Sequence, residues 1–226
     1  MSDEAKKQAA AAALEHVRDG MALGLGTGST AAWFVRLLGE RVAGGLTVRG
    51  VATSAATEAL AREVGVPMTT LDELPELDLA IDGADEVDTH MDLIKGGGGA
   101  LLREKIVASC ARQFLVIVDG SKRVRRLGAF PLPVEVIPMA AIPIQRRLAD
   151  HGREVRIRQG ADGQPFRTDE GNLILDCEFG QIADTALLAR TLNDIPGVVE
   201  HGLFVAMTDM VIIAGENGLT TMGGLD

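Results

Sequence analysis

The segment that decides the fold is Met21-Ala-Leu-Gly-Leu-Gly-Thr-Gly-Ser-Thr30, followed directly by Ala31-Ala-Trp-Phe-Val-Arg-Leu-Leu-Gly39. Residues 21–25 are apolar and predict a short strand, and residues 26–29 predict a glycine-rich loop. The apolar side chains of residues 30–39 recur at helical spacing, which predicts a helix. A strand, a glycine loop and a helix in this order form the building unit of a parallel α/β sheet.

The same alternation continues along the first 130 residues. Further strands are expected at 47–52, 77–81 and 114–118, and helices from Ser2 to about 18, at 55–64 and at 100–111. Strands that alternate with helices imply a parallel sheet whose faces are covered by those helices. We therefore expect an open parallel, Rossmann-like sheet with helices on both faces.

A second, smaller domain is expected from Pro131, where prolines cluster and the order of elements changes. The expected elements are strand 134–137, helix 140–151, strand 153–159, strand 172–177, helix 182–194 and strand 198–204. This βαββαβ order is typical of a ferredoxin-like α+β domain. The apolar run 210–214 predicts a strand that rejoins the first sheet. The predicted domains are therefore 1–130 with 205–226, and 131–204.

Composition and charge narrow the classes of function. The chain is 46% hydrophobic and 24% charged, as is usual for a folded soluble protein, and its 22 basic and 32 acidic residues give a net charge of −10. An acidic surface disfavours a nucleic-acid partner. Apolar runs are far shorter than the about 20 residues that span a membrane, and the N-terminus lacks a signal-peptide pattern. We expect a cytoplasmic protein with no membrane partner.

Glycines and hydroxyl residues follow the first strand, in Gly24-Leu-Gly-Thr-Gly-Ser-Thr30. Such a loop at a helix N-terminus offers N–H groups and hydroxyls that suit a phosphate. Thr27, Gly28, Ser29 and Thr30 are therefore candidate binding residues. The segment does not match a dinucleotide fingerprint because the third glycine is missing, and it has no P-loop lysine. A plain tight turn between strand and helix is the alternative.

Two acids leave the next apolar strand, in Ile81-Asp-Gly-Ala-Asp-Glu86. Asp82, Gly83, Ala84 and Asp85 are therefore expected at the carboxyl edge of the sheet, where α/β proteins bind ligands. The alternative is a solvated turn capped by its own aspartate. A calcium loop needs acids at alternate positions, whereas successive aspartates here are three residues apart. We expect no metal ion.

A run of four glycines, Lys95-Gly-Gly-Gly-Gly-Ala100, leads into the helix that carries Glu104. Consecutive glycines are conformationally costly and indicate close approach of the backbone to a ligand. The candidate binding residues of this run are Lys95, Gly96, Gly97 and Gly98. Taken alone, Glu104 would be an ordinary surface acid of a helix. The glycines and the charged residues around it make Glu104 a candidate catalytic residue.

Together these residues favour proton transfer beside a carbonyl group. In that reaction one carboxylate moves the proton and a cation stabilises the enediolate oxygen. The residue set contains neither a metal cage nor a cofactor motif, and we expect neither a metal nor a cofactor.

Five ordered motifs resemble those of the type A ribose-5-phosphate isomerase family over essentially the whole chain. They are residues 24–30, residues 81–86, Lys95–Ala100 with Arg103-Glu-Lys105, Asp119-Gly-Ser-Lys122, and Phe130-Pro-Leu-Pro-Val-Glu-Val136. The resemblance implies interconversion of ribose 5-phosphate and ribulose 5-phosphate through an enediolate, in the pentose phosphate pathway. It also implies a homodimer or a tetramer.

By the same resemblance, Glu104 is the general base and Lys95 stabilises the oxyanion. Asp82 helps to open the sugar ring, and Asp85 holds hydroxyls of the open chain. The implied substrate-binding set is completed by Thr27, Gly28, Ser29, Thr30, Gly83, Ala84, Gly96, Gly97, Gly98 and Lys122. The motifs leave open which loop holds the phosphate. The segment 176–180 departs from the family pattern and is expected to touch none of the catalytic motifs.

Two other classes of function stay open from the sequence. A non-catalytic sugar-phosphate sensor of the same fold needs an output module, and no basic helix-turn-helix is evident. An acyl-CoA transferase needs its glutamate in another context, and an amino-sugar-phosphate deaminase needs a histidine at the site. The four histidines lie in no convincing motif.

Overall fold

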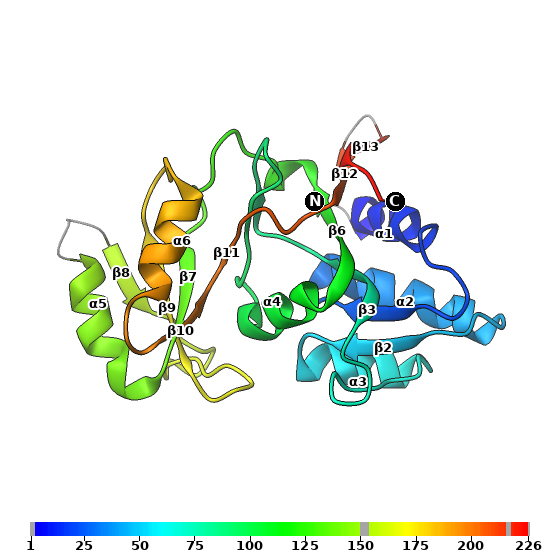
Figure 1. Cartoon of the computed structure of the whole chain (residues 1–226), viewed down its shortest axis with the longest axis horizontal. Coiled ribbons are helices and arrows are strands. Elements are labelled where there is room, and N and C mark those ends of the chain that lie inside the picture. The colour runs from blue at the N-terminus through cyan, green and yellow to red at the C-terminus, as the bar shows by residue number, and fades with distance from the viewer. Residues whose placement is uncertain (1–2, 150–153, 216–217, 226) are drawn as a thin grey trace. The chain divides into compact units, whose positions relative to one another are not determined.

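The computed structural model describes residues 3–149, 154–215 and 218–225, in two compact units (Figure 1). The first unit comprises Met1–Ala84, Arg103–Arg123 and Met207–Asp226, and the second comprises Asp85–Leu102 and Val124–Ala206. Ser2, the expected start of the first helix, and the junction between the expected helix and strand at 150–153 lie outside the described residues.

The first unit is built around a six-stranded sheet in the order β13-β12-β6-β3-β1-β2. Its strands are β1 (Ala22–Leu25), β2 (Arg49–Ala52), β3 (Leu77–Asp82), β6 (Ala111–Asp119), β12 (Met210–Gly215) and β13 (Gly218–Gly223). All neighbours pair in parallel except β13, which is antiparallel to β12. The strand expected at 210–214 does rejoin this sheet. The edge strand β13 was not predicted.

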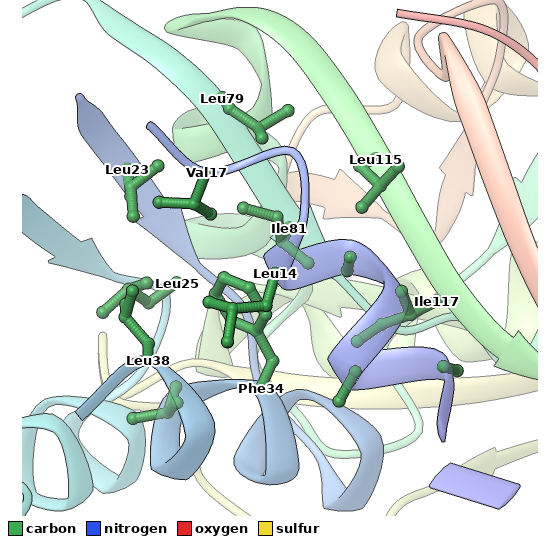
Figure 2. Close-up of a cluster of buried hydrophobic side chains, with 14 of the residues drawn as sticks. Leu14, Val17, Leu23, Leu25, Phe34, Leu38, Leu79, Ile81, Leu115 and Ile117 are labelled. Atoms are coloured by element: carbon green, nitrogen blue, oxygen red, sulfur yellow. The ribbon is translucent and has the colours of Figure 1, made fainter. Parts of the chain in front are cut away.

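Helices cover both faces of this sheet, as the sequence predicted. The helices are α1 (Asp3–Leu14), α2 (Ser29–Ala43), α3 (Ala55–Glu63) and α4 (Leu101–Ser109), and a short 3-10 turn, η1 (Gly120–Lys122), follows β6. Figure 2 shows Leu23 and Leu25 of β1 packed in one cluster with Phe34 of α2. Gly24, which lies between those two leucines, faces the opposite side and meets Val107 of α4. No described helix is both long and apolar enough to cross a membrane.

The second unit contains the expected βαββαβ arrangement. Its elements are β7 (Leu132–Val136), α5 (Ala141–Ala149), β8 (Glu154–Ile157), β9 (Leu173–Glu178), α6 (Thr185–Asn193) and β10 (Val198–His201), with a short 3-10 turn, η2 (Pro138–Ala140), before α5. The four strands form an antiparallel sheet in the order β10-β7-β9-β8. The two middle strands, β7 and β9, are almost wholly buried.

A second, three-stranded sheet in this unit was not predicted. It consists of β4 (Glu86–Val87), β5 (Leu93–Ile94) and β11 (Leu203–Phe204), in the order β11-β5-β4. The single strand expected at 198–204 is therefore two strands that meet at Gly202. The Gly202 N–H donates to the Pro133 carbonyl, and its own carbonyl accepts the Lys95 N–H, so the chain changes partners at this residue.

The division of the chain differs from the predicted one in residues 85–102, 124–130 and 205–206, which were expected in the large domain and lie in the second unit. The carboxylate of Glu86 explains the first two differences. It accepts the N–H groups of Gly128 and Phe130, each at 2.6 Å, and so ties β4 to the start of β7. Strands as short as β4 carry too weak a pattern to be found in a sequence.

Glu135 lies fully buried in β7, with 0% of its surface exposed. Its Oε1 accepts hydrogen bonds from Thr168 Oγ1 and Asn172 Nδ2, both at 2.9 Å. Burial raises the pKa of the Glu135 carboxyl above its ordinary value. The two hydrogen bonds act to lower this pKa, and the nearby carboxylates of Glu170 and Glu200 raise it further.

We expect Glu135→Gln to raise the melting temperature at pH 8 by about 2–4 °C, which corresponds to about 1 kcal/mol. When folding raises the pKa of an acid, that acid contributes most to the stability of the fold at pH values below its ordinary pKa. That contribution is lost as the pH rises through the raised folded-state pKa. The amide stays neutral and still accepts both hydrogen bonds, so the difference should vanish toward pH 4.5. Thermal unfolding between pH 4.5 and 8 tests this, with exposed Glu154→Gln as control. Equal melting temperatures at pH 8 would contradict it.

Candidate active site

A cluster of hydroxyl groups fixes the loop after β1. Thr27 Oγ1 lies 2.7 Å from Thr53 Oγ1, 2.8 Å from Ser54 Oγ and 3.1 Å from Thr57 Oγ1. Thr57 Oγ1 donates to the Gly26 carbonyl at 2.9 Å, and the Ser54 side chain caps α3. The end of β2 and the start of α3 therefore hold the glycine loop. Sequence reasoning missed these supporting residues, although the hydroxyls at 53 and 54 directly follow an expected strand.

Asp82 ends β3 and is 2% exposed. Its Oδ1 accepts the Thr27 N–H at 3.0 Å and the Gly83 N–H at 2.7 Å. The Gly26 N–H donates to the Ile81 carbonyl at 2.9 Å. Thus the structure brings together the first two motifs, as expected for loops at the same edge of a parallel sheet. The solvated turn considered as an alternative does not describe this buried aspartate.

Gly26 leaves no room for a side chain beside Asp82. A Cβ at position 26 would lie 2.2 Å from Asp82 Oδ1 and 2.5 Å from its Cα. We expect Gly26→Ala to lower the free energy of unfolding by about 2–3 kcal/mol, because the backbone of β3 has to move. Urea unfolding measures this. Gly120→Ala is the control, since its Cβ would lie no closer than 3.8 Å to its neighbours. Equal stability of the two variants would contradict the expectation.

The start of α2 is open to solvent. Gly28 and Ser29 are exposed and Thr30 is half-buried. Gly28 stands at the N-cap and has no side chain that can occupy the first N–H groups of the helix. Lys122 is half-buried at the end of η1, in the turn that follows β6. Asp119 Oδ1 accepts the Ser121 N–H at 2.8 Å and so shapes this turn.

Glu104 lies in the first turn of α4 and is only 5% exposed, so it is not the surface acid that its position alone would predict. Three residues later, Val107 packs against Gly24 and the sheet. Because α4 leads directly into β6, which is parallel to β3, the helix begins at the carboxyl edge of the sheet. A buried carboxylate at that edge is suited to general acid and base work.

The remaining predicted residues belong to the second unit. Lys95 follows β5, is 2% exposed, and holds its Nζ 5.5 Å from the centre of the Phe204 ring. A buried ammonium that packs on an aromatic face is a cation that is largely withdrawn from water. The Lys95 N–H donates to the Gly202 carbonyl at 2.9 Å, which fixes the backbone where the glycine run begins.

Asp85 is half-buried, and its Oδ2 accepts the Gly97 N–H at 2.7 Å. Its own N–H donates to the Ile94 carbonyl at 2.8 Å. Gly96 adopts φ +104°, a left-handed conformation that favours glycine. Gly97 and Gly98 are exposed. The second and third motifs thus meet at Asp85 and Gly97.

The described part of the chain shows no cluster of three His, Cys, Asp or Glu side chains that could hold a metal ion.

The predicted site residues form two sets, one in each unit. Thr27–Thr30, Asp82–Ala84, Glu104 and Lys122 belong to the first unit, and Asp85 with Lys95–Gly98 belongs to the second. Their joint action on one substrate stays a prediction.

A parallel sheet with a hydroxyl loop and buried carboxylates at its carboxyl edge defines an α/β enzyme that acts on a small polar molecule. The sequence model of the family described as ribose 5-phosphate isomerase A (phosphoriboisomerase A) matches residues 49–218. Ribose-5-phosphate isomerase A of Agrobacterium fabrum is 57% identical, with 96% of each chain covered. That of Rhodopseudomonas palustris strain BisB18 is 55% identical, covering 96% of this chain and 97% of its own.

Solved structures of ribose 5-phosphate isomerases also match this chain over nearly its whole length. A D-ribose-5-phosphate isomerase in complex with phospho-erythronic acid matches with a TM-score of 0.96 and 41% identity, over 99% of this chain and 100% of its own. Ribose 5-phosphate isomerase from Plasmodium falciparum matches with a TM-score of 0.95 and 35% identity over all of both chains. The chain therefore belongs to the ribose 5-phosphate isomerase A family, as its five motifs predicted.

Proposed function

We propose that this chain is an aldose–ketose isomerase that interconverts D-ribose 5-phosphate and D-ribulose 5-phosphate through an enediolate. The observation that carries this is membership of the family at 55–57% identity over nearly the whole chain. The burial of Glu104, a carboxylate, and of Lys95, a cation, supports the chemistry. A non-catalytic sensor is not supported, since the relatives are named as isomerases.

In the proposed reaction, the Glu104 carboxylate removes the proton from C2 of the open-chain aldose. The electron pair of the broken C–H bond forms the C1–C2 double bond, and negative charge develops on O1. Lys95 stabilises that charge. The protonated Glu104 then returns its proton to C1, while a proton moves from O2 to O1, and the ketose results. One carboxylate thus acts first as base and then as acid.

The other residues bind and prepare the sugar. Asp82 assists ring opening and relays a hydroxyl proton, and Asp85 accepts hydroxyl groups of the open chain. The open start of α2, with the hydroxyls of Ser29 and Thr30, supports the phosphate at this helix N-terminus. Lys122 adds a positive charge to the same ligand.

The proposed proton transfer uses the carboxylate of Glu104 and the charge of Lys95, and the resemblance to the family implies a metal-free reaction. We therefore propose no organic cofactor and no metal ion. We also propose a cytoplasmic homodimer, in keeping with the resemblance to the family. The net charge of −10 supports a small-molecule substrate over a nucleic-acid partner.

Proton NMR of ribose 5-phosphate in D₂O, with and without EDTA, tests the proposed function. We expect ribulose 5-phosphate to form at the same rate in both samples, with deuterium entering at C1. A protein that binds the sugar phosphate but leaves its C–H bonds intact would be a sensor. Loss of turnover with EDTA would overturn the metal-free reaction.

A further inference from the structure

A single peptide group in the glycine run is held from both ends. The Gly97 N–H donates to Asp85 Oδ2 at 2.7 Å, and the Gly96 carbonyl accepts from Arg158 Nη1, also at 2.7 Å. Both bonds engage the peptide that joins residues 96 and 97. A rotation of this peptide plane would break both hydrogen bonds at once.

The guanidinium that binds this peptide is itself fixed. Arg158 Nε donates to Asp176 Oδ2 at 3.0 Å, and Nη2 donates to Asp176 Oδ1 at 2.5 Å. Two parallel bonds of this kind set the plane of the guanidinium. The backbone of Arg158 bonds to Ile174 and Phe166, and its side chain is only 14% exposed. The remaining Nη1 therefore points at Gly96 in one orientation, and it also lies 3.2 Å from the Gly97 carbonyl.

Four consecutive glycines have no side chains with which to hold their own conformation. Each glycine loses more backbone freedom on ordering than any other residue. Within the run, one turn bond from the Gly99 N–H to the Gly96 carbonyl at 3.0 Å adds order. The 96–97 peptide is fixed from outside the run, by Arg158 and Asp85. The positive charge of the guanidinium also polarises this peptide, which strengthens the N–H bond to the Asp85 carboxylate.

We infer that Arg158 and Asp176 are positioning residues of the active site, which orient the carboxylate of Asp85 through the 96–97 peptide. The inference rests on the proposed function in that Asp85 acts there on the sugar hydroxyls. Asp176 opens a segment that departs from the family pattern, and it reaches the glycine run through Arg158. The contact joins residues 62 positions apart, which is why the sequence did not reveal it.

A double-mutant cycle between Arg158→Gln and Asp85→Asn tests the inference. We expect Arg158→Gln to lower kcat/KM about 10- to 100-fold, the size of loss that a small misplacement of a reacting group causes. If Arg158 acts through Asp85, the double variant should fall within about twofold of Asp85→Asn alone. A merely structural role would make the two losses multiply, and that outcome would overturn the inference.

Arg156→Gln is the matched control. Arg156 lies two residues earlier, in β8, its side chain is 66% exposed, and it pairs with Glu154 and Glu178. We expect its kcat/KM to match the wild type within about twofold. Arg158→Lys should retain part of the activity, since it keeps the charge but not the planar fork. If Arg158→Gln does not fold, Asp176→Asn takes its place in the cycle.

The failure of this inference can be told apart from the failure of the proposed function. A wild-type chain that does not isomerise ribose 5-phosphate would refute the proposed function. The same cycle is then run on the dissociation constant for phospho-erythronic acid, the ligand of the related structure. Wild-type activity together with an unaffected Arg158→Gln variant would overturn the inference alone.

Discussion

Glu104→Gln should abolish isomerisation, with kcat lower by about 10³-fold or more, while the fold is retained. An amide of the same shape cannot take a proton from C2, so the variant loses the proton transfer itself. The side chain is 5% exposed, and a neutral group in its place removes the cost of burying a charge. Proton NMR in D₂O should show no deuterium at C1, and circular dichroism should match the wild type.

Glu58→Gln is the matched control for this experiment. Glu58 also lies in the first turn of a helix, α3, but is about half exposed and pairs with Arg62 at 2.6 Å. We expect its kcat to equal that of the wild type. If Glu104→Gln were to keep more than about a tenth of the wild-type kcat, another group would be the base, and the assignment of Glu104 would be wrong.

The main architecture of both units could be predicted because their long elements carry strong periodic patterns. The β1–loop–α2 segment and the βαββαβ order are examples. The two-residue strands β4 and β5 carry no such pattern, and only their pairing with each other and that of β5 with β11 define them. The segment 85–102 was therefore assigned to the large domain, although Glu86 ties it to residues 128 and 130.

The candidate site was predictable where glycines and charges crowd together in the chain. Thr27 and Asp82 were expected at one sheet edge, and they are hydrogen-bonded there. The groups that hold the motifs were not predictable, because they are ordinary residues until the chain folds. In the sequence, nothing distinguishes Arg158 from the other arginines. In the structure, its burial and its contact with the Gly96 carbonyl distinguish it. Sequence thus indicates the groups proposed to do chemistry better than those that orient them.

Lys95→Met should lose activity without losing stability. A methionine fills nearly the same space on the Phe204 ring and needs no hydration, so we expect the melting temperature to stay equal or rise. The charge that stabilises the enediolate oxygen is lost, and kcat should fall about 10²- to 10³-fold. Steady-state kinetics and thermal unfolding of one sample measure both. Phe204→Leu is the control, since it removes the ring but leaves the ammonium. It should lower the melting temperature and change kcat little. A Lys95→Met variant with wild-type kcat would show that the oxyanion is stabilised by another group.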